Sequence, residues 1–395
     1  MTERLYYTDP YLTEFDANVL SVEEHGGRPA AVLDRTAFYP TSGGQPFDVG
    51  RLGDTAVVDV VDRDDGVILH IVEHSIPTGR VRGAVDWPRR FEHMQQHTGQ
   101  HVLSAAFDRL VGARTESFHL GSGSSTIDLT RVVSSAEIDR VEDEANRVVW
   151  EDRPVAIRFV DAEEAARLPL RKESVRTGTL RIIDVQDFDV SACGGTHVSR
   201  TGAIGSILVR SAEKFRGGSR VEFLCGVRAL RGYRELRGAI DGSIRLLSVL
   251  PAELAAAIER LQGDAKEARR EITDLQVRLA GFEADALAAR AEQTGGVKAV
   301  IAPLEGWDQQ GLKAIASAIA SRPGHVAALF SLSAPAAVVI ARSADLTIDS
   351  AAILKKLIER FGGKGGGRAD LAQGGGLQGS AGDIVAFVRS ICSST

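Results

Sequence analysis

Two short segments carry the residues with the clearest chemical potential. The first, His97-Thr-Gly-Gln-His101, places two histidines four residues apart, on one face of a helix and within reach of one metal ion. The second is Cys193-Gly-Gly-Thr-His197, whose glycines allow a tight turn that brings thiolate and imidazole together. Three imidazoles and a thiolate favour zinc over magnesium or calcium. The sequence therefore predicts a zinc site made of these four side chains.

Other features near these segments narrow the chemistry. The first segment lacks the glutamate of HExxH, so Gln100 is excluded as the general base of a zincin-type protease. His93 would share the helix face of His97 and could replace it as a ligand or support it. His70 and His74 repeat the spacing in a strand-like stretch, where such residues lie about 13 Å apart, so we expect them to be structural.

The elements that must position these residues form an α+β pattern. Short strands separated by Gly, Asp and Pro are predicted at 28–33, 55–61, 67–72 and 80–85. A helix from Arg89 to Val111 carries the first two histidines, and a second helix runs from Ser135 to Asp152. Strand-like runs continue to residue 225. The first 225 residues therefore predict an α+β fold.

A heptad repeat follows. Apolar residues spaced four and three apart form one seam: Leu254, Ile258, Leu261, Ala265, Ala268, Ile272, Leu275, Leu279, Phe282, Ala286 and Ala289. Such a seam predicts a coiled-coil helix about 60 Å long. A preceding helix near 227–247 could fold back on it as a hairpin, or the seam could join two chains in a homodimer.

The last hundred residues form a small α/β unit. Strands are predicted at 297–301, 327–331 and 336–341, with helices at 308–321 and 350–361. A glycine-rich loop from 361 to 376 precedes a final helix at 381–391. The predicted domains are residues 1–88 (β-rich), 89–226 (zinc-binding), 227–295 (helical hairpin or coiled coil) and 296–395 (small α/β).

Composition sets outer limits on function. The 395 residues are 44% hydrophobic and 25% charged, as in ordinary globular proteins. A net charge of −6 gives no overall attraction for nucleic acid, so an RNA partner would need a local basic patch. Three cysteines, no long apolar run and no signal-peptide pattern predict a cytoplasmic protein without a membrane partner.

The two metal-binding segments resemble the zinc motif of the alanyl-tRNA synthetase editing domain and of the AlaX editing proteins. Residues 94–104 look like that family's core helix, and Phe38-Tyr-Pro-Thr-Ser-Gly-Gly-Gln-Pro46 is similar to the glycine-rich motif of longer AlaX forms. The heptad region and the Gly-Lys-Gly-Gly-Gly-Arg loop resemble the C-Ala (DHHA1-like) domain. The resemblance implies a long-form AlaX, a trans-editing hydrolase that deacylates mischarged tRNA(Ala), chiefly Ser-tRNA(Ala), with glycine as a second amino acid to test.

The resemblance also suggests candidate residues around the zinc. Gln45 is a candidate contact to the seryl group or to the reacting water, and Thr41, Gly43 and Gly44 are its candidate substrate-binding neighbours. His119 is a second candidate catalytic residue. Four protein ligands describe a closed structural zinc site, whereas hydrolytic zinc usually keeps a position open. The sequence leaves open whether zinc activates water or only orients the substrate, and we assign no general base.

Candidate tRNA contacts lie in two basic, glycine-containing stretches. They are Lys214, Arg216, Arg220, Lys364 and Arg368. The second stretch is not a Walker A motif, because no Lys-Ser/Thr pair opens the next helix. Only about ninety residues precede the first histidine segment, so we expect no ATP-dependent charging domain. The alternatives are a non-catalytic, zinc-stabilised tRNA-binding module and an editing hydrolase for another ester, such as Ser-tRNA(Thr).

Overall fold

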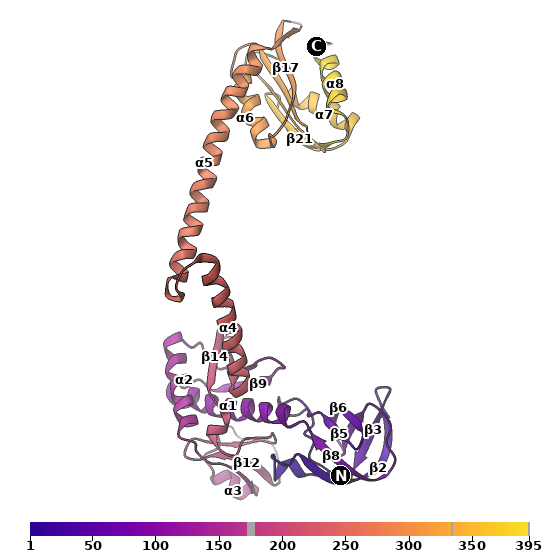
Figure 1. Cartoon of the computed structure of the whole chain (residues 1–395), viewed down its shortest axis with the longest axis vertical. Coiled ribbons are helices and arrows are strands. Elements are labelled where there is room, and N and C mark those ends of the chain that lie inside the picture. Colours follow the sequence, from indigo (N-terminus) through magenta and orange to yellow (C-terminus); the bar gives the residue numbers. More distant parts are fainter. Residues whose placement is uncertain (172–177, 295, 333–334, 394–395) are drawn as a thin grey trace. The chain divides into compact units, whose positions relative to one another are not determined.

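The computed structural model describes residues 1–171, 178–294, 296–332 and 335–393. These residues form two compact units, Met1–Ser243 and Ile244–Thr395 (Figure 1). The mixed α+β class is confirmed, while the division at residues 88, 226 and 295 stays a prediction. Among the helices of the described residues, none combines the length and apolar character that a membrane crossing requires.

Unit 1 begins with a closed β-barrel. Its strands follow the order β2 (Glu14–His25), β3 (Arg28–Leu33), β7 (Ile68–Val72), β6 (Thr55–Asp62), β5 (Gly50–Leu52) and β8 (Gly79–Val85), and β8 closes on β2. Two short strands, β1 (Glu3–Arg4) and β4 (Arg35–Thr36), pair beside it, and a 3-10 turn, η1, spans Leu5–Tyr7. The barrel encloses its own apolar core. It provides the framework that holds the loop at residues 41–48.

Helix α1 (Trp87–Val111) is the central element of unit 1 (Figure 1). The Asp86 side chain caps its first turn by accepting from Arg89, and Gly112 ends it in a left-handed conformation. Every residue from His93 to Phe107 is buried. The Gln96 amide exchanges hydrogen bonds of 2.8 and 2.9 Å with the backbone of Cys225, which holds the helix against the neighbouring sheet.

Strands of two sheets and helix α2 (Ser135–Trp150) pack around α1. One sheet has the order β14 (Ile207–Phe215), β15 (Gly218–Cys225), β10 (Ser125–Leu129) and β9 (Thr115–Leu120), and the other has the order β11 (Val155–Val160), β12 (Leu180–Val185) and β13 (Asp189–Ala192). Helix α2 starts with a capping box between Ser134 and Glu137. Helix α3 (Ala162–Arg167) and the turn η2 (Thr201–Ile204) complete this part.

Helix α4 (Gly226–Leu247) and the turn η3 (Pro251–Glu253) lead to α5 (Leu254–Ala289), which carries the heptad repeat. The helix ends at Ala289, the last residue of the predicted seam, and the short strand β16 (Glu292–Thr294) follows. The seam residues Ile258, Leu261 and Leu275 are exposed. Their pairing with α4 or with a second chain stays a prediction.

The rest of unit 2 is a six-stranded sheet with helices on both faces. Its order is β16, β17 (Val297–Leu304), β18 (His325–Ser331), β19 (Ala336–Arg342), β21 (Leu371–Leu377) and β20 (Lys364–Gly367). Helix α6 (Gln309–Ala320) and the end of α5 cover one core, while α7 (Ser350–Phe361) and α8 (Ala381–Ser393) cover the other. The prediction of a loop at 361–376 was wrong, because glycines there pair as the hairpin β20–β21.

A buried ion pair joins α1 to the barrel. The Arg90 guanidinium donates to both oxygens of Asp48 (Nε distances 3.1 and 3.0 Å), and both side chains are fully buried. Arg90 also donates to the carbonyls of Pro10 and Ala37, and the Asp48 carboxylate accepts from Tyr39 N at 2.7 Å. Because Asp48 ends the loop that carries Gln45, this pair ties that loop to the helix that carries His97.

Replacing Asp48 with alanine leaves a buried guanidinium without its counter-charge. We expect D48A to lower the free energy of unfolding of unit 1 by about 3–5 kcal/mol, measured by denaturant unfolding followed through Trp87 fluorescence. The control D16A removes an exposed ion pair with Arg80 in the same barrel and should cost less than about 1 kcal/mol. Equal losses in the two variants would contradict this role of Asp48.

Candidate metal centre

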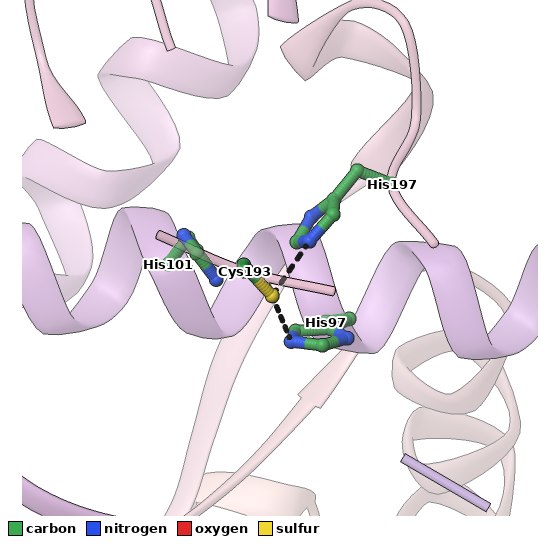
Figure 2. Close-up of side chains that lie close together, drawn as sticks. All are labelled: His97, His101, Cys193 and His197. Atoms are coloured by element: carbon green, nitrogen blue, oxygen red, sulfur yellow. Dashed lines mark hydrogen bonds between the residues drawn. The ribbon is translucent and has the colours of Figure 1, made fainter. Parts of the chain in front are cut away.

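The structure brings together all four side chains of the two segments. His97 and His101 project from α1, and Cys193 and His197 come from the chain after β13 (Figure 2). One ligand atom from each lies within 4.8 Å of all the others. Cys193 Sγ is 3.4 Å from Nε2 of His97 and 3.3 Å from Nε2 of His197. These four residues could therefore hold one metal ion.

The Nδ1 atom of each imidazole contacts a polar side chain outside the cluster. Nδ1 of His97 bonds Gln45 Oε1 at 2.8 Å, and Nδ1 of His101 bonds Asp189 Oδ2 at 2.9 Å. Nδ1 of His197 lies 3.2 Å from Thr98 Oγ1. An acceptor at Nδ1 places the proton there and leaves the Nε2 lone pair for a metal. This arrangement supports metal binding more strongly than proximity alone.

Buried charges around the cluster favour its deprotonated sulfur. Burial alone would raise the pKa of Cys193, but the His97 and His197 imidazoles and hydrogen bonds from His101 and His197 hold it well below its ordinary value. Burial would also raise the pKa of Asp189, which hydrogen bonds and charge from His101 and Arg171 lower. A thiolate with three neutral imidazoles is a donor set that zinc takes in proteins.

Position 195 requires a glycine, because the side chains of His97 and Gln45 leave no room for a Cβ atom. A Cβ atom at this position would lie 2.1 Å from Cε1 of His97 and 3.1 Å from Oε1 of Gln45. At Gly194 the nearest atom to such a Cβ would be Tyr7 Oη, at 3.6 Å. Neither glycine has a positive φ. The predicted reason for the glycines, a tight turn, is therefore replaced at Gly195 by contact with the metal-binding helix.

The cluster forms part of the wall of a cavity of about 460 Å³. His97, His101 and Cys193 line this cavity, whereas His197 does not. The remaining wall includes the aromatic rings of Tyr7, Tyr39, Phe118 and Phe159 and the hydroxyls of Ser42, Thr115, Ser117, Thr179 and Ser191. A small molecule in this cavity would meet three of the four donor residues and a largely polar rim.

Gln45 lies behind the cluster and does not line the cavity. Its side chain is fully buried, donates to Thr196 Oγ1 at 2.8 Å and accepts from Thr196 N at 3.1 Å as well as contacting His97. The structure thus gives Gln45 a supporting contact to a metal-binding imidazole, in place of the expected contact to seryl group or water. Its polar atoms are all used within the protein.

The other residues predicted to lie near the metal differ in whether they line the cavity. Gly43 lines the cavity, while Gly44 packs on the Phe118 backbone and accepts from Leu120 N. Thr41 is exposed and lies outside the cavity, where its hydroxyl accepts from Phe47 N. His119 is also exposed and is not one of the residues that line the cavity, whereas the ring of its neighbour Phe118 contacts the His97 ring. The structure therefore gives His119 no contact with the cluster.

The remaining histidines do not join the cluster. His70 is buried in the barrel, where it bonds Thr36 Oγ1 at 2.7 Å and the Ala31 carbonyl at 3.1 Å. Its predicted structural role is confirmed. His93 is buried on α1, but it is not among the four residues of the cluster.

The predicted RNA contacts lie at two hairpins. Lys214 and Arg216 are exposed near the β14–β15 turn, and Arg220 bonds both oxygens of Asp128, at 2.7 and 2.9 Å. Lys364 is exposed on β20, and Arg368 pairs with Asp370 at 3.2 Å. Binding of RNA by these five residues stays a prediction.

Three residues of the site were not anticipated from the sequence. Thr98 and Asp189 orient imidazoles, and Arg181 lines the cavity. Thr98 lies within the first histidine segment, so helical geometry could have suggested its contact with a second element. Asp189 and Arg181 belong to strands whose positions relative to α1 depend on the tertiary fold.

We expect Q45A to lower zinc affinity by about 10–100-fold, because the His97 ring loses the acceptor that orients it. Competition with a chromogenic chelator measures this affinity. S42A is the control, since Ser42 belongs to the same loop and lines the cavity but is not one of the three residues bonded to an imidazole. Wild-type affinity in Q45A would show that the hydrogen bond is dispensable.

The two glycines should differ in their tolerance of a methyl group. G195A forces the His97 ring to move, so the purified variant should contain much less zinc than the wild type. G194A adds only an ordinary van der Waals contact and should retain about one zinc per chain. Elemental analysis of both proteins provides the comparison, and full zinc occupancy in G195A would contradict the packing argument.

Known proteins are similar to this chain in parts of both units. The chain matches the DHHA1 domain over residues 296–394 and the threonyl and alanyl tRNA synthetase second additional domain over residues 180–222. It is 34% identical over 390 residues to an alanine–tRNA ligase of Pyrococcus abyssi, a match that covers 94% of this chain. The chain spans 42% of the length of that ligase.

Two further relatives are shorter. The C-Ala domain of Aquifex aeolicus alanyl-tRNA synthetase aligns with 26% of this chain and 97% of its own, at 25% identity and a TM-score of 0.25. The alanyl-tRNA editing protein AlaX-L of Pyrococcus horikoshii is 33% identical over 385 residues, which cover 95% of this chain and 94% of AlaX-L. On this near full-length similarity, the chain belongs to the AlaX-L family of alanyl-tRNA editing proteins.

Proposed function

We propose that this protein is a zinc-dependent hydrolase that acts in trans on mischarged tRNA(Ala) and cleaves chiefly the ester of Ser-tRNA(Ala). One observation carries the proposal: three of the four residues of the metal-binding cluster line a cavity of about 460 Å³. A purely structural metal site has no need of such an opening. The cavity lies within the size range of small-molecule sites, and an aminoacylated adenosine is a ligand of that size.

The chemistry of the amino acids explains why such a site is useful. Serine carries one hydroxyl more than alanine, and a synthetic site shaped for alanine rejects it poorly. The hydroxyls of Ser42, Thr115 and Ser191 on the cavity wall are suitable partners for a seryl hydroxyl. Thr115 Oγ1 already donates to Ser104 Oγ at 2.7 Å and Ser191 Oγ donates to Asp189 Oδ2 at 2.8 Å, so their oxygens would act as acceptors. An alanyl ester has no hydroxyl to donate to them, which favours hydrolysis of the serine ester.

The protein's own residues prepare the site before the substrate arrives. Gln45, Asp189 and Thr98 keep the three imidazoles oriented, so the donors need not reorganise. A zinc ion bound there would act as a Lewis acid toward a carbonyl oxygen or water. We assign no side chain as general base.

For tRNA binding, the exposed cations Lys214, Arg216 and Lys364 are the strongest of the candidates. Arg220 and Arg368 already share their charge with carboxylates, so we expect them to contribute less. The DHHA1 match over residues 296–394 supports a role for unit 2 in this binding. The tRNA body would then supply affinity while the cavity selects the amino acid.

Two alternatives keep part of this proposal. A non-catalytic, zinc-stabilised module would bind tRNA but leave the ester intact. An editing hydrolase for Ser-tRNA(Thr) would keep the chemistry, and the matched second additional domain is described for both threonyl and alanyl synthetases. The similarity to AlaX-L over nearly the whole chain favours the alanyl substrate.

Deacylation of Ser-tRNA(Ala), measured beside Gly-tRNA(Ala), Ala-tRNA(Ala) and Ser-tRNA(Thr) with zinc content determined on the same sample, tests the proposal. We expect about one zinc per chain and hydrolysis of the seryl ester about 100-fold faster than of the alanyl ester. Chelation should abolish hydrolysis, and added zinc should restore it. A folded, zinc-loaded protein that binds tRNA and hydrolyses no ester would leave the binding module as the function.

A further inference from the structure

Arg181, on strand β12, is a buried side chain of the cavity wall with one donor group left over. Its Nε donates to the Tyr7 carbonyl at 2.9 Å, and Nη1 donates to the carbonyls of Cys193 and Gly195 at 2.7 and 2.9 Å. The residue is 8% exposed, and its Nη2 has no hydrogen-bond partner among the described residues. A buried guanidinium nitrogen without a partner is costly, so a ligand that accepts from it is expected.

The charge of Arg181 is also uncompensated. Arg90 has Asp48 as its buried partner and Arg171 has Asp189, at 2.7 Å, but no carboxylate of the described residues forms an ion pair with Arg181. Burial disfavours the charged guanidinium and lowers the pKa of Arg181. A negatively charged oxygen beside Arg181 would supply the missing counter-charge.

We propose that Nη2 of Arg181 donates a hydrogen bond to a negatively charged oxygen of the aminoacylated 3′ end of tRNA. Two oxygens of that end have this chemistry: the ester carbonyl oxygen as it gains charge during hydrolysis, and a phosphate oxygen on the 5′ side of the terminal adenosine. The inference rests on the proposed function. The planar guanidinium suits both tasks, because Nε and Nη1 hold backbone carbonyls while Nη2 keeps its donor capacity for a ligand.

Arg181 takes no proton in this scheme. The oxygen of a water molecule bonds to the ester carbonyl carbon, the bond from that carbon to the ribose oxygen breaks, and the ribose oxygen leaves with a proton. The products are free serine and tRNA with both terminal hydroxyls. A fixed, buried donor stabilises the charge on the carbonyl oxygen and can contribute about 100–1,000-fold to kcat.

The test compares R181Q and R181K with the wild type and with the control R158Q. Arg158 lies on the neighbouring strand β11, pairs with Glu164 and Asp184, and does not line the cavity. For each protein we would measure zinc content, thermal unfolding, and kcat and KM for Ser-tRNA(Ala). Binding of the non-hydrolysable 3′-seryl-amide of 3′-amino-3′-deoxyadenosine, with and without a 5′-phosphate, completes the set.

Two results support the proposal, and they distinguish the two oxygens. If Nη2 serves the ester, zinc-loaded R181Q or R181K loses about 100-fold or more in kcat with little change in KM. If it serves the phosphate, kcat is retained, KM rises, and the variant no longer prefers the phosphorylated analogue. R158Q should match the wild type in every measurement.

Two results overturn the proposal. One is a zinc-loaded Arg181 variant with wild-type kcat, KM and analogue binding. The other is loss of zinc or of folding in both Arg181 variants, which would assign the residue to holding the Cys193–Gly195 backbone. If the wild type hydrolyses no ester, the proposed function fails. The role of Arg181 in binding is then tested separately, by comparing the affinities of the wild type and the variants for the two analogues.

Discussion

The hydrogen bond between Gln45 and His97 connects the barrel loop to α1, the helix that carries two of the four candidate metal ligands, and it orients the His97 ring. Gln45 is fully buried and bonds both the imidazole of His97 and the backbone and hydroxyl of Thr196. It thereby links three segments that are remote in the chain: the loop at 41–48, α1 and the Cys193–His197 segment. The nearby ion pair of Arg90 and Asp48 also joins the loop to the helix. The orientation of the His97 ring thus depends on the position of the barrel.

Burial strengthens these polar contacts, and it also makes any unpaired polar group destabilising. Inside unit 1 the charge of Arg90 is matched by Asp48, and the chain Arg171–Asp189–His101 shares one negative charge between two donors. In a low-dielectric interior such groups must be paired, because an unpaired charge loses its hydration without replacement. Arg181 departs from this rule at the point where the cavity meets the metal-binding loop. An exception of this kind is typical of a surface that completes its pairing with a ligand.

Unit 2 is organised by different forces. Its sheet is covered by helices through two apolar cores, and the end of α5 contributes Ala280 and Ala284 to one of them. Along the preceding turns of α5 the apolar seam is exposed, so the heptad pattern describes a helix whose burial depends on a neighbour. Gly365 and Gly367 of β20 pair closely with β21, because a Cβ atom there would lie only 2.6 and 2.4 Å from the backbone of the opposite strand. A glycine-rich stretch here makes a closely packed hairpin, where composition had indicated a loop.

The sequence by itself determined the residue types of the candidate metal site, most of the helices and the α+β class. His97 and His101 share a helix face by local geometry alone, and the Cys193–His197 spacing brings a second donor pair close together, so four donors could be named without a fold. The tertiary structure decided which side of the cluster each neighbour occupies. Gln45 turned out to support a ligand, His119 faced away from it, and Arg181 and Asp189 entered the site from strands distant in sequence. Local spacing determines which residues share an element, but contacts between elements depend on packing and burial, which no short motif encodes.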